Sequence, residues 1–128
     1  MQRPHSMLVG KSCLVVDDEL LIALDIEQIL LAAGAASVIC LASAEEALAS
    51  VHGSHFDVAV LDVLLRGAAH ASFSVAAALQ LRNTPFVFLT GMRRADLRMS
   101  EYPAAPVVEK PYQPSLLIDA VVRALTAR

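Results

Sequence analysis

Five short apolar runs alternate along the chain with longer segments in which apolar residues recur at helical spacing. The runs cover residues 13–16, 36–41, 58–61, 86–89 and 107–109. Continuous apolar runs of this length are typical of strands in a parallel sheet that is covered on both faces. The segments between them are long enough to supply crossover helices. The pattern therefore predicts an α/β fold built from βαβ units around a parallel sheet.

Local signals mark the boundaries of the first two expected helices. Apolar residues at helical spacing run from Leu20 to Leu31, and Gly34 provides a C-terminal stop. The sequence Ser43-Ala44-Glu45-Glu46 predicts a capping box for a short second helix that ends near Ser50.

The second half of the chain is less regular. A third helix is expected over residues 74–81, and Pro114 takes the first position of the last helix. Between them, residues 93–99 predict only a short helix, and the prolines in 102–106 disfavour regular structure. We expect residues 91–105 to be the most mobile part of the fold.

Length and composition predict one globular domain that spans residues 9–128. Residues 1–8 are expected to form an unstructured or extraneous tail before it. The chain has 128 residues, of which 56% are hydrophobic and 18% charged, and this excludes a disordered protein. A net charge of −3 gives no electrostatic reason to bind nucleic acid, and Arg93, Arg94 and Arg98 are interpreted as a solvated helix face. The isolated cysteines Cys13 and Cys40 indicate a reduced, cytoplasmic protein.

A membrane span and a secretory signal are not expected. The longest uncharged stretch, residues 28–44, contains Gly34 and Ser37 and divides into a helix end, a turn and a strand. Residues 1–7 lack the apolar core of a signal peptide.

Acidic side chains close two of the apolar runs. Asp17 and Asp18 follow the first run, and Asp62 follows the third. If these strands are neighbours in a parallel sheet, their carboxyl ends meet where open α/β sheets bind ligands. Three carboxylates repel one another unless a cation neutralises them, and an all-oxygen site suits Mg²⁺ or Mn²⁺. Asp18 is also expected to cap the first helix, but capping explains neither the doublet nor Asp62.

Two further polar residues stand at strand ends. Thr90 closes the fourth run and Lys110 follows the fifth. Carboxylates can hold a metal, Lys110 can neutralise phosphoryl oxygens and Thr90 can donate a hydrogen bond to them. Asp62, at the centre of the set, is the natural nucleophile.

With these residues the chain resembles the receiver domain of two-component response regulators, which are bacterial signalling proteins. The matching residues are the Asp17-Asp18 pair, Asp62, Thr90-Gly91 and Lys110-Pro111. The resemblance implies a doubly wound, flavodoxin-like, five-stranded sheet of order 2-1-3-4-5. It further implies that Asp62 is phosphorylated by a histidine kinase or a phosphotransfer protein.

The resemblance also implies roles for individual residues. Mg²⁺ would be held by Asp18, Asp62 and the backbone carbonyl of Leu64, with Asp17 assisting through water. The backbone amides of Val63 and Gly91 would complete the phosphoryl site around Thr90 and Lys110, and Lys110-Pro111 would be a cis peptide.

The chain departs from the common receiver pattern in ways that indicate a subgroup. Val107 stands where most receivers carry an aromatic switch residue. The segments 62–67 and 85–91 resemble the alphaproteobacterial FAT GUY subgroup, although Leu89 replaces its Ala and Met92 begins a diverged continuation. Members of that subgroup are often stand-alone receivers paired with HWE-type histidine kinases.

Without the aromatic switch, we expect residues 91–106 to change order or position on phosphorylation while Val107 stays packed. The resemblance places Leu64 and Met92 at positions where receivers tune access of water to the acyl phosphate. Because both are apolar, we expect slow loss of the phosphoryl group.

The main interpretation is a phosphorylation-activated receiver that signals by binding a target protein or by phosphorelay. The alternatives are a receiver that forms part of a longer hybrid kinase or transcription regulator, a phosphate sink, and a degenerate receiver that only binds. A small-molecule phosphohydrolase with an Asp nucleophile is disfavoured because Leu64 replaces the second Asp that haloacid-dehalogenase-type phosphatases carry. The expected state is a monomer or weak dimer. A kinase would contact Leu20, Leu21 and Tyr112; the alternative is that the two leucines are core residues and Tyr112 covers Lys110.

Overall fold

The computed structural model describes residues 7–65, 71–91 and 97–127. It contains five strands, four α-helices and a short 3₁₀ helix. The strands are β1 (Ser12–Val16), β2 (Ser37–Leu41), β3 (Val58–Asp62), β4 (Phe86–Thr90) and β5 (Val107–Glu109). The helices are α1 (Leu20–Ala32), α2 (Ala44–Gly53), α3 (Ala71–Leu81), η2 (Leu97–Glu101) and α4 (Pro114–Thr126).

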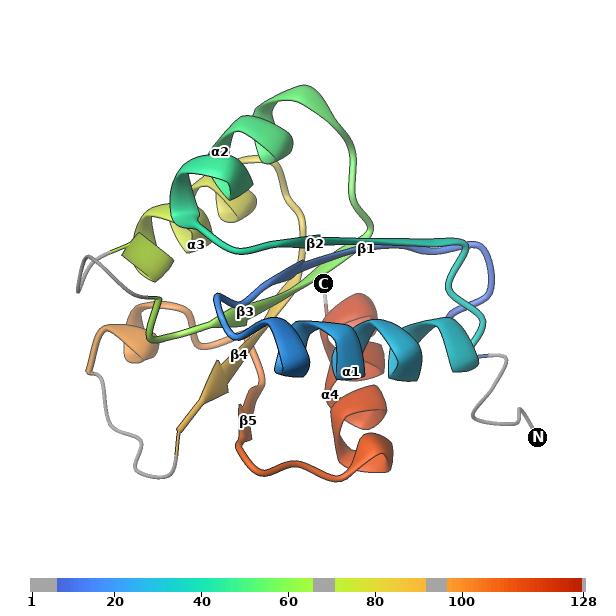
Figure 1. Cartoon of the computed structure of the whole chain (residues 1–128). Coiled ribbons are helices and arrows are strands. Elements are labelled where there is room, and N and C mark those ends of the chain that lie inside the picture. Colours follow the sequence, from blue (N-terminus) through green and yellow to red (C-terminus); the bar gives the residue numbers. More distant parts are fainter. Residues whose placement is uncertain (1–6, 66–70, 92–96, 128) are drawn as a thin grey trace.

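All strand pairs are parallel, and the sheet has the order β2-β1-β3-β4-β5. Helices α1 and α4 cover one face and α2 and α3 the other (Figure 1). This confirms the predicted doubly wound, flavodoxin-like sheet. The order reverses between β1 and β3, so a crevice is expected at the carboxyl ends of these two strands.

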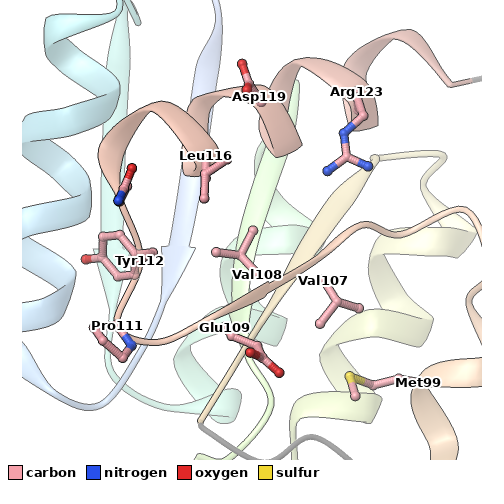
Figure 2. A pocket seen from close by; sticks show the side chains of 10 residues that line it. Met99, Val107, Val108, Glu109, Pro111, Tyr112, Leu116, Asp119 and Arg123 are labelled. Atoms are coloured by element: carbon pink, nitrogen blue, oxygen red, sulfur yellow. The ribbon is translucent and has the colours of Figure 1, made fainter.

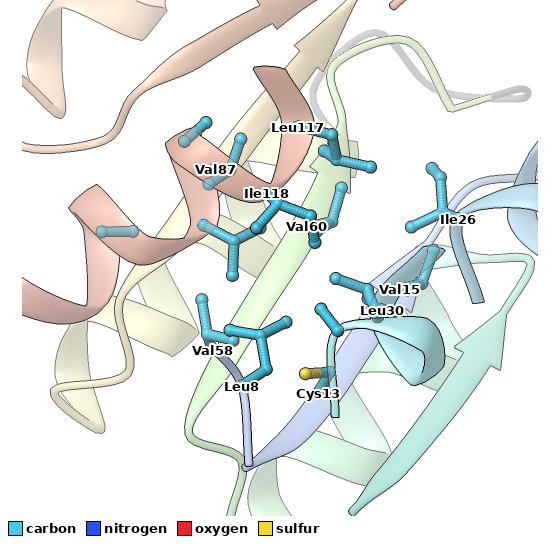
Figure 3. Close-up of a cluster of buried hydrophobic side chains, with 14 of the residues drawn as sticks. Leu8, Cys13, Val15, Ile26, Leu30, Val58, Val60, Val87, Leu117 and Ile118 are labelled. Atoms are coloured by element: carbon cyan, nitrogen blue, oxygen red, sulfur yellow. The ribbon is translucent and has the colours of Figure 1, made fainter. Parts of the chain in front are cut away.

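Alternate residues of the central strands β1, β3 and β4 supply two separate cores. In β1, Cys13 and Val15 point to the α1/α4 side, whereas Leu14 and Val16 point to the α2/α3 side. Figure 3 shows the first of these cores, in which side chains from β1, β3, β4, α1 and α4 meet. All residues of the three central strands β1, β3 and β4 are buried except Ser12, which explains their uninterrupted apolar runs.

The N-terminal boundary lies earlier than the sequence suggested. Leu8 falls within the predicted tail, but its side chain is fully buried in the α1/α4 core, and its N–H donates to the carbonyl of Ala33. Met7 packs against the same core. Met7 and Leu8 therefore pack at the end of the sheet opposite the acidic residues, and the domain includes at least residues 7 and 8.

The helix boundaries agree with the predictions except at three points. The N-cap of α1 is Glu19 and not the expected Asp18, and the Glu19 side chain makes no capping hydrogen bond. Asp17 Oδ1 accepts the N–H of Glu19 itself at 2.8 Å. Helix α2 extends beyond Ser50 to Gly53, and α3 begins three residues before the predicted start.

Other boundary signals are confirmed. Gly34, just after α1, has a φ of 103°, the left-handed conformation that ends a helix. The hydroxyl of Ser43 accepts the N–H of Glu46 at the start of α2, and Pro114 is the first residue of α4. None of the helices in the described part of the chain is long and apolar enough to cross a membrane.

The segment before β5 is anchored by Tyr102. Its ring lies 5.6 Å from that of Phe86, 5.9 Å from Phe88 and 6.4 Å from Phe73, measured between centroids. The predicted short helix over 93–99 lies partly outside the described residues, and what is described there is η2.

Candidate functional site

Three carboxylates meet where the sheet order reverses. Asp17 follows β1 directly and Asp62 ends β3, and the neighbouring residues Val16 and Leu61 are paired in the sheet. With Asp18, they each offer an oxygen atom within 4.8 Å of the others. Asp17 and Asp62 are buried, whereas Asp18 is half-buried. The strand-end prediction for these residues is therefore confirmed.

Lys110 supplies the positive charge of this cluster. Its Nζ lies 3.2 Å from Asp17 Oδ2, 3.5 Å from Asp62 Oδ2 and 3.3 Å from Glu19 Oε1. The backbone holds Lys110 next to Thr90, because the N–H of Lys110 donates to the Thr90 carbonyl at 2.8 Å. Thr90 is buried at the end of β4, so all five predicted polar residues lie at one end of the sheet.

Burial dominates the electrostatics of the phosphoacceptor candidate. Desolvation and the nearby charge of Asp17 raise the pKa of Asp62 to about 6, although Lys110 and the N–H of Leu64 oppose the shift. Desolvation would lower the pKa of Lys110, but the charges of Asp62 and Asp17 outweigh it and raise that pKa. Lys110 therefore stays protonated at neutral pH, and Asp62 is ionised in most molecules.

The donor set fits a hard divalent cation. Asp17 Oδ2 is buried and makes no directed hydrogen bond to the described residues, so only the ion pair with Lys110 compensates it. The carboxylates of Asp18 and Asp62 add oxygen atoms within reach of the same point. Mg²⁺ and Mn²⁺ prefer such oxygen ligands over nitrogen or sulfur.

The turn after β3 differs from the expectation in one respect. The N–H of Val63 donates to the Leu89 carbonyl at 2.9 Å, so it continues the sheet and does not face the acids. The N–H of Leu64 instead donates to Asp62 Oδ1 at 3.1 Å. The backbone amide at the site is therefore that of Leu64, whose side chain is 68% exposed.

The Lys110-Pro111 peptide is cis, as expected. The next residue, Tyr112, does not cover Lys110 with its hydroxyl but donates from it to Asp25 Oδ2 at 2.9 Å. Burial and the neighbouring Asp25 raise the pKa of Tyr112 above its usual value, so the phenol remains a donor. This bond joins α1 to the loop that carries Lys110.

Val107 is exposed in this structure, and its response to phosphorylation stays a prediction. It is 45% exposed and lines a groove of about 820 Å³ between β5 and α4. Figure 2 shows Tyr112 and Pro111 at one end of this groove and Met99 at the other, with Leu116 on α4.

The surface predicted to meet a kinase is exposed. Leu20 and Leu21, at the start of α1, are 68% and 80% exposed and lie next to the acidic cluster in sequence. The alternative that they are core residues is therefore wrong. The side chains of Met92, Arg93, Arg94 and Arg98 lie outside the described residues, and so do Arg66 and Gly67.

Sequence reasoning missed two residues at the site. Glu19 pairs with Lys110, and its position next to the Asp doublet is a signal that could have indicated it. Ser72 contacts the backbone of the turn after β3, but nothing in the sequence links it to residues ten positions earlier. The role of the Gly91 amide stays a prediction.

The comparisons with known proteins agree with this geometry. A profile of the response regulator receiver domain matches residues 13–122. A response regulator receiver protein from Sinorhizobium medicae has a similar structure, with a TM-score of 0.81 and 28% identity over 92% of this chain and 96% of that one. SdrG from Pseudomonas melonis, solved in a BeF3-activated conformation, is 35% identical over 92% of this chain and 98% of its own, with a TM-score of 0.76. A search of curated proteins found no match. The chain therefore belongs to the response regulator receiver domain family.

Proposed function

We propose that this receiver takes up a phosphoryl group on Asp62 in a Mg²⁺-dependent reaction and passes the signal on by binding a target protein or by phosphorelay. The donor is a histidine kinase or a phosphotransfer protein. The observation that carries the proposal is the meeting of Asp17, Asp18, Asp62 and Lys110 at one end of the sheet. The chain acts as the acceptor of the group, not as an enzyme on other substrates.

The residues of the cluster have distinct parts in the transfer. An Asp62 oxygen forms the new bond to phosphorus, the bond from phosphorus to the donor's histidine nitrogen breaks, and that nitrogen keeps the electron pair. The pKa of Asp62, about 6, leaves its carboxylate ionised and nucleophilic at neutral pH. Lys110 is placed to neutralise the added charge, and Thr90 to donate a hydrogen bond to it.

Mg²⁺, when bound, would neutralise phosphoryl oxygens during the transfer. Asp18, Asp62 and the Leu64 carbonyl would hold it, with Asp17 assisting. The Leu64 amide, which already donates to Asp62, and the Gly91 amide are the backbone donors for the phosphoryl group. The Val63 amide has no part in this proposal because it is bonded to Leu89.

We place the chain in the FAT GUY subgroup on the sequence around Phe86, Phe88 and Thr90, and pair it with an HWE-type kinase in the cytoplasm. The relative SdrG was solved in a BeF3-activated conformation, and we propose that this chain also has an activated conformation. It acts as a monomer or weak dimer, and the exposed Leu20 and Leu21 are the kinase contacts.

The test is phosphorylation by acetyl phosphate or phosphoramidate with and without Mg²⁺, followed by intact mass. We expect one Mg²⁺-dependent phosphoryl addition in the parent and none in Asp62→Asn. Asp119→Asn, which alters an exposed carboxylate on α4, is the matched control and should be modified like the parent. If neither donor modifies the parent, and BeF3 with Mg²⁺ leaves its amide NMR spectrum unchanged, the proposal is wrong.

A further inference from the structure

A buried serine contacts the backbone where β3 ends at the phosphoacceptor. Ser72, the second residue of α3, is fully buried. Its Oγ lies 2.6 Å from the carbonyl oxygen of Asp62 and 2.6 Å from that of Val63. A hydroxyl has one proton, so it donates to one of the two carbonyls at a time. In a regular strand successive peptide groups point in alternate directions, and the convergence of two carbonyls on one atom therefore marks a bend directly after β3.

The peptide unit is planar, so fixing its carbonyl also fixes the N–H on its opposite side. The unit that contains the Val63 carbonyl also contains the Leu64 N–H, which donates to Asp62 Oδ1 at 3.1 Å. The unit before it contains the Asp62 carbonyl and the Val63 N–H, which donates to the Leu89 carbonyl at 2.9 Å. The Ser72 hydroxyl thus lies at the carbonyl side of two successive peptide units. The N–H of the first unit is bonded to β4, and the N–H of the second is bonded to the Asp62 carboxylate.

We infer that Ser72 is a positioning residue for phosphoryl uptake, because its hydroxyl fixes the peptide that aims the Leu64 N–H at Asp62. This inference rests on the proposed function, since it assigns a role in the same reaction. Without the hydroxyl, the Val63-Leu64 peptide can rotate. Its N–H then leaves the carboxylate, and the Leu64 carbonyl leaves the place proposed for it beside the metal.

The experiment compares Ser72→Ala with the parent and two controls. Ser115→Ala removes a serine hydroxyl from the corresponding second position of α4, where the side chain is exposed. Val75→Ala removes buried apolar atoms from α3 and no hydrogen-bonding group, so it reproduces a loss of stability alone. The readouts are the rate of phosphorylation by acetyl phosphate at saturating Mg²⁺, the Mg²⁺ affinity by calorimetry and amide hydrogen exchange by NMR.

For Ser72→Ala we expect phosphorylation and Mg²⁺ affinity to fall on the order of 10-fold, as for other groups that orient metal ligands. The amides of Val63 and Leu64 should exchange about 10-fold faster, while those of β1 stay unchanged. Both controls should behave like the parent in phosphorylation and metal binding at temperatures where they are folded.

Parent-like phosphorylation of Ser72→Ala would overturn the inference, and so would an equal loss in Val75→Ala. Unchanged exchange at Leu64 would overturn it as well. If the parent itself takes up no phosphoryl group, the proposed function fails and the positioning role fails with it, while the exchange rates still report whether the hydroxyl fixes the turn.

Discussion

Lys110 Nζ lies 3.2 Å from Asp17 Oδ2, although two strands separate β5 from β1 in the sheet. The long side chain of Lys110 spans this distance at the carboxyl ends of β3 and β4, and its charge compensates two buried acids. The contact explains how a cluster of carboxylates is tolerated in the folded chain before any cation binds.

Replacing Lys110 with Met should destabilise the metal-free protein. Asp17 and Asp62 would keep their burial and lose their counter-charge, so we expect the free energy of unfolding at pH 8 to fall on the order of 2 kcal/mol. Urea unfolding in EDTA measures this loss, and added Mg²⁺ should restore most of it. Lys11→Met, just before β1 and at the other end of the sheet, is the control and should change little. Equal stabilities for the Lys110→Met variant and the parent in EDTA would contradict the account.

The raised pKa of Asp62 makes the metal-free protein less stable as the pH rises. The folded carboxyl has a pKa of about 6 against an ordinary value of 3.8, so the folded state binds the proton more tightly. The resulting stabilisation is fully present below about pH 4 and is lost as the pH rises through about 6. Mg²⁺ needs the ionised form, so its stabilising effect should grow over the same range.

Thermal unfolding between about pH 4.5 and 8, in EDTA and in Mg²⁺, tests this linkage. The melting temperatures in the two buffers should diverge above about pH 6 for the parent. Asp62→Asn should lack the divergence, and a parent whose two curves run parallel would refute the assignment.

The strand-end acids were predictable because their signals are local. An apolar run followed by Asp identifies the end of a buried strand, and parallel pairing brings such ends together. Thr90 and Lys110 are predictable in the same way, because each directly follows an apolar run. Placing these residues at one edge of the sheet requires only the strand ends and not the direction of any side chain.

Other features depend on geometry that the sequence does not carry. Whether the Val63 or the Leu64 amide faces Asp62 is decided by the bend after β3, and that bend is held by Ser72 from another element. The burial of Leu8 escaped prediction because a short apolar pair before a strand has no periodicity.

The hydrogen bond from Tyr112 to Asp25 should contribute modestly to stability. Tyr112→Phe removes only the hydroxyl, and we expect a loss of about 0.5–1 kcal/mol in the free energy of unfolding. The same substitution in an Asp25→Ala background should cost nearly nothing, since the acceptor is already gone. Urea unfolding of the parent, the two single variants and the double variant gives the coupling energy between the two side chains. Additive losses would show that the hydrogen bond contributes no coupling energy.

The side chain of Leu64 should protect the phosphorylated form. It is exposed beside Asp62, where it can exclude water from the acyl phosphate. Leu64→Asn places a polar group there that can orient water, so we expect the phosphoryl group to be lost several-fold faster. The decay of the phosphorylated mass after removal of the donor measures this, with Leu64→Met as the apolar control. Equal decay of the Asn and Met variants would rule out the protective role.

The ring of Tyr102 should matter for the segment before β5 and not for phosphoryl uptake. It contacts the rings of Phe73, Phe86 and Phe88, and the carbonyl of Tyr102 accepts the N–H of Ala105. Because the side chain is half-buried, Tyr102→Ala should cost about 2 kcal/mol in stability, whereas Tyr102→Phe keeps the ring and should cost under about 0.5 kcal/mol.

Hydrogen exchange can assign that loss to the segment. In Tyr102→Ala the amides of Tyr102 and Ala105, both bonded within this segment, should exchange faster than in the parent, and those of β1 should not. The three rings that Tyr102 contacts take no direct part in the proposed transfer, so the rate of phosphorylation by acetyl phosphate should stay near that of the parent. An alanine variant as stable as the parent would show that the ring contacts do not anchor the segment. A large loss of phosphorylation would instead show that the segment and the acidic cluster are coupled through β4.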